Sequence, residues 1–318
     1  MRALVTGGAG FIGSNIVDAL LDRGDEVIVV DDLSTGRASN LEAAQRRGIT
    51  FHEADIRDGE SLQRIFAAGR PDIVFHLAAQ IDVRKSIEDP AWDAGINVGG
   101  TINVLEAAQR AGVARVVNTS TGGAIYGDVD VVPTPETTPP RPMAAYGQSK
   151  FCAEAYCGWY DRLYGLSTVT LRYGNVYGPR QDPTGEAGVI AIFCGRLVAG
   201  TRPVIYGDGR QTRDYVYVGD IVAANLAAAS HPESRGVYNV GTSSESSVLE
   251  VLGALRRAAG LGDDEFEPEF APARLGEVQR SALDVSRARS DLGFTAEVGL
   301  DEGMRRTLDW ARAAAAAA

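Results

Sequence analysis

The chain has 318 residues, 45% of them hydrophobic, which suits one large globular domain or two closely joined ones. A formal net charge of −11 argues against a nucleic acid as the partner. No run of about 18 apolar residues occurs, so no membrane span is expected, and the first residues do not have the pattern of a secretory signal. Three cysteines without a CxxC pair favour a reducing, cytoplasmic location and no metal site.

The first half of the chain alternates short apolar runs with helical patterns. Val/Ile-rich runs predict strands at 2–7, 26–32, 49–55, 72–79, 115–120 and 166–176. Helical spacing appears between them, for example at 11–24 and 98–112. Unbroken apolar runs are typical of strands that are buried on both faces. The pattern predicts an α/β fold with a Rossmann-type, doubly wound parallel sheet.

The pattern changes after about residue 176. A Gly/Pro-rich loop is followed by two short strands around a turn at 202–220, and an acidic, irregular stretch comes later. We predict an NAD-binding domain at 1–176 with returning segments at about 214–241. The remainder, 177–318, is predicted to form a smaller, discontinuous substrate lobe. Ligands of such sheets bind at the carboxyl ends of the strands, so the site is expected between the two parts.

A glycine-rich turn, "TGGAGFIG", lies between the first strand and the first helix. Gly7 would permit the tight turn, Gly10 would let a pyrophosphate approach the backbone, and Gly13 would let helix and strand pack closely. The amino terminus of the helix would supply N–H donors for phosphate. The second strand then ends in Asp31, in the order expected of a dinucleotide-binding unit.

The carboxylate of Asp31 can accept hydrogen bonds from an adenosine ribose. It would also repel a 2′-phosphate, which favours NAD over NADP. Arg37 is the nearest cation in the sequence that could weaken this preference.

The stretch "AAYGQSK" places Tyr146 and Lys150 four residues apart, on one face of a helix. Free tyrosine has a pKa of ~10 and is a poor base at neutral pH. A neighbouring ammonium would favour tyrosinate and lower that pKa, which would make Tyr146 a general base. A tyrosine and a lysine at this spacing are also common on ordinary surface helices. The catalytic interpretation therefore depends on motifs elsewhere in the chain.

Several motifs occur in a fixed order and resemble one family. They are "TGGAGFIG" (6–13), "DIR" (55–57), "HLAA" (76–79), "STGGAIYG" (120–127), "YGQSK" (146–150), "LRYGNVYGPRQ" (171–181) and "RDYVYVGD" (213–220). Together they look like an extended short-chain dehydrogenase/reductase of the UDP-glucose 4-epimerase family, over nearly the whole chain.

The resemblance implies roles for individual residues. Tyr146 would be the catalytic base, Lys150 its partner, and Thr121 the hydroxyl that bridges the base and the sugar 4-OH. The implied NAD-binding residues are Gly7, Gly10, Phe11, Ile12, Gly13, Asp31, Asp32, Asp55, Ile56, Leu77, Ala78, Ala79, Asn97, Tyr146, Lys150 and Tyr173. The implied UDP-sugar-binding residues are Arg84, Thr121, Gly122, Tyr146, Asn175, Arg213 and Arg274. The family also implies a homodimer formed through the helices at 95–111 and 146–164.

Four positions bear on the sugar. Gly174 and Ser281 stand where many members of the family carry larger residues, which would enlarge the sugar pocket. The stretch 81–90 resembles that of UDP-glucuronate 4-epimerases and would put Arg84 near the sugar. Asp182, however, replaces the arginine that those enzymes use for the uronate carboxylate.

The sequence therefore predicts an NAD-dependent UDP-hexose 4-epimerase, an isomerase that acts through a transient 4-keto sugar. Its substrate pair would be UDP-glucose/UDP-galactose, UDP-glucuronate/UDP-galacturonate or an N-acetylated relative. The alternatives are a sugar-nucleotide 4,6-dehydratase, a UDP-glucuronate decarboxylase and a non-enzymatic NAD(P)-sensing protein. Gly122 and Gly123 oppose the dehydratase, because that family places an Asp-Glu pair after its threonine.

Overall fold

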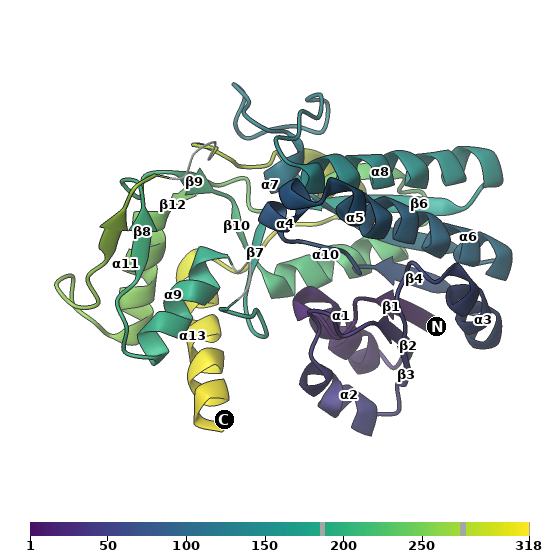
Figure 1. Cartoon of the computed structure of the whole chain (residues 1–318), viewed down its shortest axis with the longest axis horizontal. Helices are drawn as coiled ribbons and strands as arrows, with labels where there is room; N and C mark the ends of the chain where they lie inside the picture. Colours follow the sequence, from purple (N-terminus) through teal and green to yellow (C-terminus); the bar gives the residue numbers. More distant parts are fainter. Residues whose placement is uncertain (185–187, 274–277, 318) are drawn as a thin grey trace.

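A computed structural model describes residues 1–184, 188–273 and 278–317 and contains a seven-stranded parallel sheet (Figure 1). The order of the strands is β11-β6-β5-β4-β1-β2-β3, which confirms the predicted Rossmann-type architecture. The strands are β1 (Arg2–Thr6), β2 (Glu26–Asp31), β3 (Thr50–Glu53), β4 (Ile73–His76), β5 (Arg115–Thr121), β6 (Ser167–Tyr173) and β11 (Gly236–Val240). No helix in these ranges is long and apolar enough to cross a membrane.

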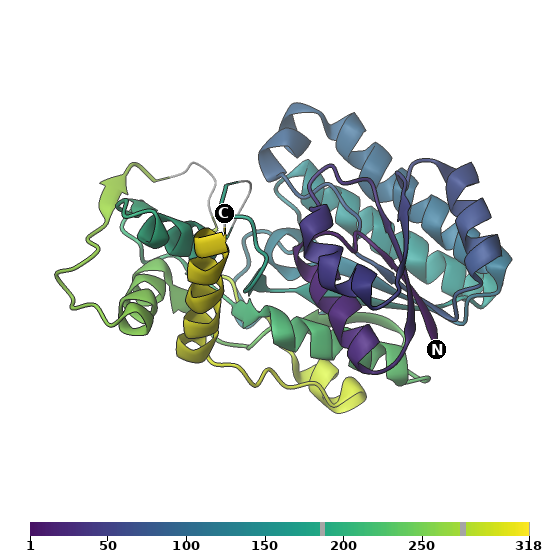
Figure 2. The ribbon, with the colours of Figure 1, turned by 90° about the horizontal axis from the view of Figure 1, so that it is seen from below.

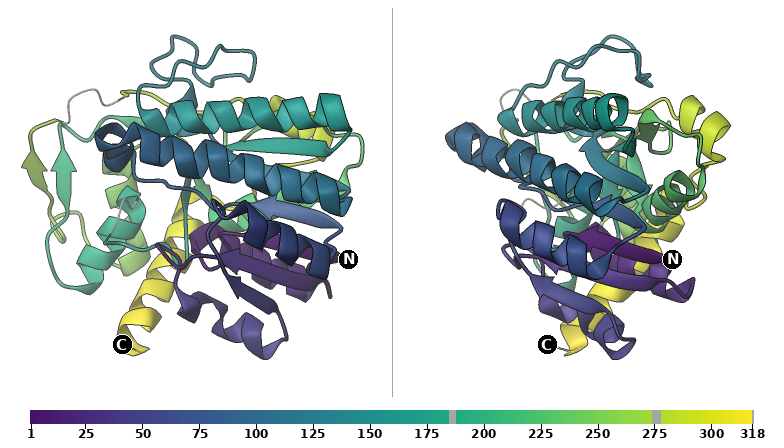
Figure 3. Two further views of the ribbon diagram at one scale, coloured as in Figure 1. Left: turned by 45° about the vertical axis from the view of Figure 1, so that its right-hand side comes forward. Right: turned by 90° about the vertical axis from the view of Figure 1, so that its right-hand side faces the viewer.

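Helices cover both faces of this sheet, and an apolar cluster fills each interface (Figure 3). One layer holds α3 (Gly59–Gly69), α6 (Thr101–Ala111) and α8 (Ala145–Tyr164), and Figure 3 shows α6 and α8 side by side. The other holds α1 (Phe11–Asp22), α10 (Val218–Ser230) and α12 (Ser286–Leu292). Shorter elements are η1 (Ala38–Leu41), α2 (Glu42–Arg46), α4 (Val83–Glu88), α5 (Pro90–Ala94), the π-helical η2 (Gly95–Gly100) and α7 (Gly122–Ile125).

The strand expected at 166–176 is broken in two at Gly174. The backbone N–H of Gly174 donates to Val240 O at 2.8 Å, whereas that of Asn175 donates to Asp214 O at 2.6 Å. The chain thus changes partner, and β7 (Asn175–Tyr177) leaves the main sheet to pair with β10 (Tyr215–Tyr217). This crossing leads the chain from the sheet into a second lobe.

The second lobe packs three helices around its own apolar core (Figure 2). They are α9 (Val189–Val198), α11 (Val248–Ala259) and α13 (Leu300–Ala317). Two small sheets accompany them, β8 (Val204–Tyr206) with β13 (Glu269–Ala271) and β9 (Thr212–Arg213) with β12 (Ser246–Ser247). Between the parts of this lobe the chain returns to the main sheet through β10, α10 and β11. The division at residue 176 stays a prediction.

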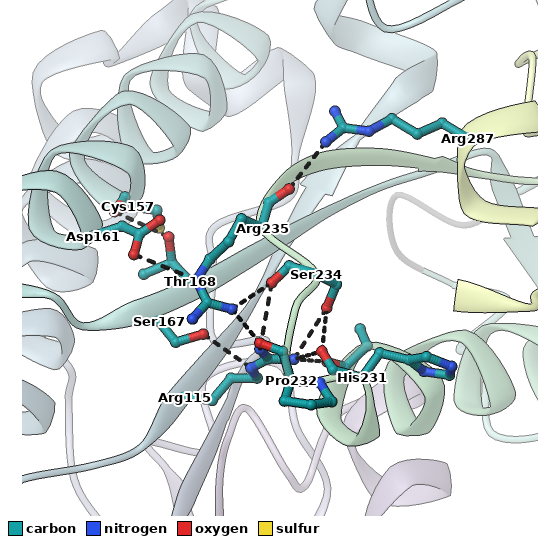
Figure 4. Close-up of polar contacts among 11 residues, drawn as sticks. Arg115, Cys157, Asp161, Ser167, Thr168, His231, Pro232, Ser234, Arg235 and Arg287 are labelled. Atoms are coloured by element: carbon teal, nitrogen blue, oxygen red, sulfur yellow. Dashed lines mark hydrogen bonds and ion pairs between the residues drawn. The ribbon is translucent and has the colours of Figure 1, made fainter. Parts of the chain in front are cut away.

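A buried arginine ties the carboxyl end of α10 to the amino ends of β5 and β6 (Figure 4). The guanidinium of Arg115 donates to the carbonyl oxygens of Ala228 and Pro232, each at 2.6 Å, and to that of His231. It also donates to Ser167 Oγ at 3.0 Å. Burial lowers the pKa of Arg115, but carbonyl oxygens at a helix carboxyl end favour a cation. This contact fixes α10 against the sheet at the amino ends of the strands, opposite the carboxyl ends at which the site is predicted.

Candidate functional site

The turn between β1 and α1 is built for glycine. Gly7 has a φ of +70°, and a Cβ there would lie 2.6 Å from Ala78 N. A Cβ on Gly13 would lie 2.1 Å from Gly7 O, and one on Gly10 would lie 3.2 Å from the same atom. Gly10 is the N-cap of α1, so bare backbone and N–H donors face the space above the helix. These residues fit the pyrophosphate of a dinucleotide.

Asp31, the last residue of β2, is bound to this turn. Its Oδ2 accepts from Ala9 N at 2.8 Å and its Oδ1 from Leu33 N at 2.9 Å. Burial raises the pKa of Asp31, although the two N–H donors oppose that effect. Asp32 holds the next turn through Ser34, whose N–H and hydroxyl donate to Asp32 Oδ1. Asp31 therefore shapes the glycine turn, and its contact with an adenosine ribose stays a prediction.

The predicted adenine contacts follow β3. Asp55 forms an ion pair with Arg57 at 2.5 Å, and the hydrogen bond from Arg57 lowers the pKa of Asp55. Ile56 is buried, and its carbonyl oxygen accepts from Asn103 Nδ2 at 3.0 Å. Asp55 is thus already paired with an arginine, and an adenine contact at this position stays a prediction.

The turn after β4 lies against the glycine turn. Leu77 N donates to Thr6 O at 3.1 Å, and Ala78 N donates to Thr6 Oγ1 at 3.3 Å. Ala79 continues this turn, and residues 11–12 begin α1 beside it. The predicted cofactor residues that follow β1 and β4 therefore lie together at the carboxyl ends of these two neighbouring strands.

Asn97 lies in a buried polar cluster that sequence reasoning missed in part. Its side chain clamps Gln80 by donating to Gln80 O and accepting from Gln80 N, both at 2.9 Å. Both side chains also donate to Asp93 Oδ1, at 2.8 Å from Gln80 and 3.1 Å from Asn97. Asp93 is fully buried, and its Oδ2 accepts no hydrogen bond from the part of the chain that the structure describes. No motif pointed to Asp93, since a single acidic residue carries no local signal.

Two of the three predicted catalytic residues, Thr121 and Tyr146, meet at the carboxyl end of β5, and Lys150 follows on the same helix as Tyr146. Thr121 ends β5 and caps α7, where its Oγ1 accepts from Ala124 N at 3.2 Å. Tyr146 is the second residue of α8, and its hydroxyl is hydrogen-bonded to Thr121. Its backbone N–H donates to Ser86 Oγ at 3.0 Å, which fixes the start of the helix. Lys150, one turn later, is buried on the same helix.

The expected low pKa of Tyr146 is wrong for these surroundings. Burial raises the pKa of Tyr146 to about 12, and the charge of Asp93 acts in the same direction. The hydrogen bond to Thr121 opposes both effects. Burial also lowers the pKa of Lys150 to about 8, while the charges of Glu154 and Asp93 favour its ammonium. Removal from water outweighs the effect that the helical spacing alone suggested.

A buried ion pair holds α8 on the sheet one turn beyond Lys150. The guanidinium of Arg172, in β6, contacts Glu154 in α8 at 2.6 and 2.9 Å. It also donates to Tyr126 Oη at 2.8 Å. Both charged side chains are almost completely buried, with 5% and 3% of their surface exposed. The pair therefore fixes the helix that carries Tyr146 and Lys150.

Tyr173, predicted to line the nicotinamide, has its ring in the apolar core. Its hydroxyl is 3.2 Å from Thr119 Oγ1 and 3.0 Å from Asn225 Oδ1 on α10. These contacts give the side chain a packing role, and its contact with a nicotinamide stays a prediction.

The predicted sugar-nucleotide residues are less closely grouped. A Cβ on Gly123 would lie 3.4 Å from Asn175 Oδ1, which places Asn175 beside the turn that follows Thr121. Arg213, in β9, donates to the carbonyl oxygens of Thr212 and Val278, both at 2.8 Å. Arg84 is an exposed residue of α4. Arg274 lies outside the described residues.

Two glycines of the sugar region are explained by packing. A Cβ on Gly174 would lie 2.8 Å from Asp214 O, so its small size serves the close approach of β7 to the residue before β10. A Cβ on Gly122 would lie 2.4 Å from Leu283 Cδ1. The enlarged sugar pocket inferred from Gly174 and Ser281 stays a prediction.

Asp93 gives a prediction for the pH profile. Asp93→Asn removes a charge that raises the pKa of both Tyr146 and Lys150. The acid limb of turnover, which reports tyrosinate formation, and the alkaline limb, which reports loss of the ammonium, should both move down by about one pH unit. Asp89→Asn is the matched control, because Asp89 is an exposed cap of the same helix. If both limbs of the pH profile of Asp93→Asn stayed at their wild-type positions, Asp93 would not raise the pKa of Tyr146 and Lys150.

Residues 1–184, 188–273 and 278–317 contain no group of three or more His, Cys, Asp or Glu residues that could hold a metal ion.

Comparison with known proteins agrees with this geometry. UDP-glucose 4-epimerase of Mycolicibacterium smegmatis is 47% identical over 313 residues, which cover 98% of this chain and 99% of that protein. The crystal structure of UDP-glucose 4-epimerase with UDP-glucose from Thermotoga maritima superposes with a TM-score of 0.94 at 46% identity, and covers 99% of this chain and 100% of that one. The Thermus thermophilus UDP-glucose 4-epimerase complex with NAD gives a TM-score of 0.90, with the same identity and coverage. Residues 3–241 match the NAD dependent epimerase/dehydratase family, and the chain belongs to that family.

Proposed function

We propose that this chain is an NAD-dependent UDP-hexose 4-epimerase. The observation that carries the proposal is the hydrogen bond between Tyr146 and Thr121, with Lys150 one helical turn away. The glycine turn after β1 would supply the dinucleotide site, which also lies at the carboxyl ends of the strands. The named relatives support UDP-glucose and UDP-galactose as the substrate pair.

The side chains divide the proton chemistry among themselves. Tyr146, as tyrosinate, would take the proton of the sugar 4-OH, with Thr121 bridging the two oxygens. When bound, NAD would accept a hydride from C4 and return it to the opposite face, and its positive ring would act with Lys150 in favouring tyrosinate. Moving the pKa of Tyr146 from about 12 to about 7 requires about 7 kcal/mol, at ~1.36 kcal/mol per unit. Bound NAD would have to contribute most of this difference, because Lys150 already stands one helical turn away where the pKa of Tyr146 is about 12.

The other sugar-nucleotide reactions fit these residues less well. A 4,6-dehydratase would need an acidic pair after Thr121, where Gly122 and Gly123 stand. Leu283 lies so close to Gly122 that an acidic side chain there would collide with it. A protein that only senses NAD(P) would not need Tyr146 and a buried Lys150 one turn apart on one helix.

The test is direct. Purified protein is incubated with UDP-glucose, UDP-glucuronate and UDP-N-acetylglucosamine separately, without added NAD, and the products are separated by chromatography. We expect UDP-galactose to form from UDP-glucose and to reach equilibrium, because the reaction leaves NAD unchanged overall. Formation of a 4-keto-6-deoxy sugar, or of a pentose from UDP-glucuronate, would contradict the proposal.

We also propose that the protein works in a reducing, cytoplasmic compartment, because all three cysteines are free thiols.

We propose in addition that the chain forms a homodimer. Trp159, on the exposed side of α8, makes edge-to-face contacts with Tyr156 and Tyr164, and the three side chains are 38% to 48% exposed. An aromatic patch of this kind is typical of an interface. Light scattering should give twice the chain mass, and Trp159→Glu should give the monomer mass, whereas a monomeric wild type would contradict the dimer.

A further inference from the structure

A segment of the second half of the chain lies across the dinucleotide-binding unit. This segment, residues 178–184, follows β7 and is called the strap below. Asn15 Nδ2, in α1, donates to Pro179 O at 3.3 Å. Arg180 forms an ion pair with Asp18, also in α1, at 2.5 Å. The strap is thus attached to the helix whose amino end forms the cofactor turn.

A third contact joins the strap to the turn after β2. Asp182 Oδ2 accepts a charged hydrogen bond from Arg37 Nη2. Asp182 is itself held in place, because its Oδ1 accepts from Thr184 N at 2.8 Å and Thr184 Oγ1 at 2.6 Å. Burial alone would raise the pKa of Asp182, but the hydrogen bonds from Thr184 and Arg37 lower it below its usual value. Asp182 is therefore an ionised, positioned anion.

Arg37 belongs to the part of the turn that surrounds Asp31. Its backbone N–H donates to Ala9 O at 3.0 Å. A Cβ on the preceding Gly36 would lie 2.7 Å from Asp31 Oδ1 and 3.0 Å from the Cβ of Ala9. A guanidinium next to the ribose-binding carboxylate is the group that commonly accommodates the 2′-phosphate of NADP. In this chain its charge is directed to Asp182.

We propose that Asp182 is a cofactor-specificity residue, which acts by holding Arg37 in an ion pair and so keeps it from pairing with a 2′-phosphate. The inference rests on the use of NAD by this chain and explains how a turn that contains an arginine excludes NADP. It also gives Asp182 a role on the cofactor side of the protein, whereas the sequence comparison had linked this position to the sugar. Asp182 is a positioning residue, and its effect must pass through Arg37.

The experiment measures bound nucleotides rather than activity. Four proteins are expressed and purified separately under identical conditions: wild type, Asp182→Asn, Arg37→Ala/Asp182→Asn and Asp18→Asn. The nucleotides that each protein carries are released with acid and quantified as an NADP:NAD ratio. We expect Asp182→Asn to raise this ratio about fivefold, equivalent to ~1 kcal/mol, because the side chains of the pair are 59% and 38% exposed and such pairs contribute little more. The double variant and Asp18→Asn should keep the wild-type ratio.

Asp18→Asn is the matched control, because it makes the same chemical change in another ion pair of the same strap. An unchanged ratio in Asp182→Asn would overturn the proposal. An equal rise in the double variant would also overturn it, since the effect would then not pass through Arg37. An equal rise in Asp18→Asn would assign the effect to loosening of the strap. Wild-type protein without any nicotinamide nucleotide would instead contradict the use of NAD itself.

Discussion

Tyr146→Phe is expected to lower turnover by about 10²- to 10⁴-fold, the usual contribution of a general acid–base group. The ring and its packing in the start of α8 remain, and only the hydroxyl that contacts Thr121 is lost. Binding of UDP-glucose should therefore be nearly unchanged. Turnover is measured by separating UDP-galactose from UDP-glucose, and binding is measured by calorimetry.

Tyr164→Phe is the control for this substitution, because Tyr164 lies at the exposed end of the same helix. It should turn over as wild type does. If Tyr146→Phe kept more than a tenth of the wild-type rate, the base would have to be another residue. If it lost binding as strongly as turnover, its role would be to hold the sugar rather than to move a proton.

Glu154→Gln should destabilise the protein by about 3–5 kcal/mol, because it leaves the guanidinium of Arg172 buried without its counter-charge. Among the described residues, Arg172 keeps the hydroxyl and ring of Tyr126 and the neutral amide as partners. The free energy of unfolding is obtained from urea titration followed by circular dichroism. The variant should also lose activity at urea concentrations lower than those that unfold it, since Glu154 follows Lys150 by one helical turn.

Glu26→Gln makes the same change in an exposed ion pair with Arg2, in which the arginine and glutamate side chains are 40% and 72% exposed. It should cost no more than about 1 kcal/mol. Similar losses in the two variants would mean that burial does not govern the contribution of the Arg172–Glu154 pair. Both variants remove one carboxylate charge from an ion pair with an arginine, so the comparison isolates the effect of removal from water.

Features that depend on neighbouring residues were predictable from the sequence. The alternation of apolar runs with helical spacing predicted the parallel sheet, because strands and helices bury side chains with different periods. The spacing of Gly7, Gly10 and Gly13 predicted the tight turn between β1 and α1, where a Cβ on Gly7 or Gly13 would overlap neighbouring backbone atoms. The spacing of Tyr146 and Lys150 placed both residues on one helix.

Features that depend on residues distant in the sequence were not predictable. The pKa of Tyr146 is set by burial and by Asp93, which lies on a different helix and has no motif of its own. The break after β6 depends on Asp214, which lies far along the chain. The pairing of Arg37 with Asp182 requires a loop of the second half to fold back over the first. Such contacts exist only once the tertiary structure brings the segments together.

The fate of the hydrogen on C4 tests the central claim most directly. UDP-glucose that carries deuterium at C4 is incubated with the protein in ordinary water, and the UDP-galactose formed is analysed by mass spectrometry and proton NMR. The product should keep the deuterium at C4, because the hydride is removed and returned within one site while only the 4-OH proton passes through Tyr146. Replacement of the deuterium by solvent hydrogen would mean that C4 is inverted through loss of a proton, and would contradict the assignment of Tyr146, Lys150 and the glycine turn to a transient oxidation.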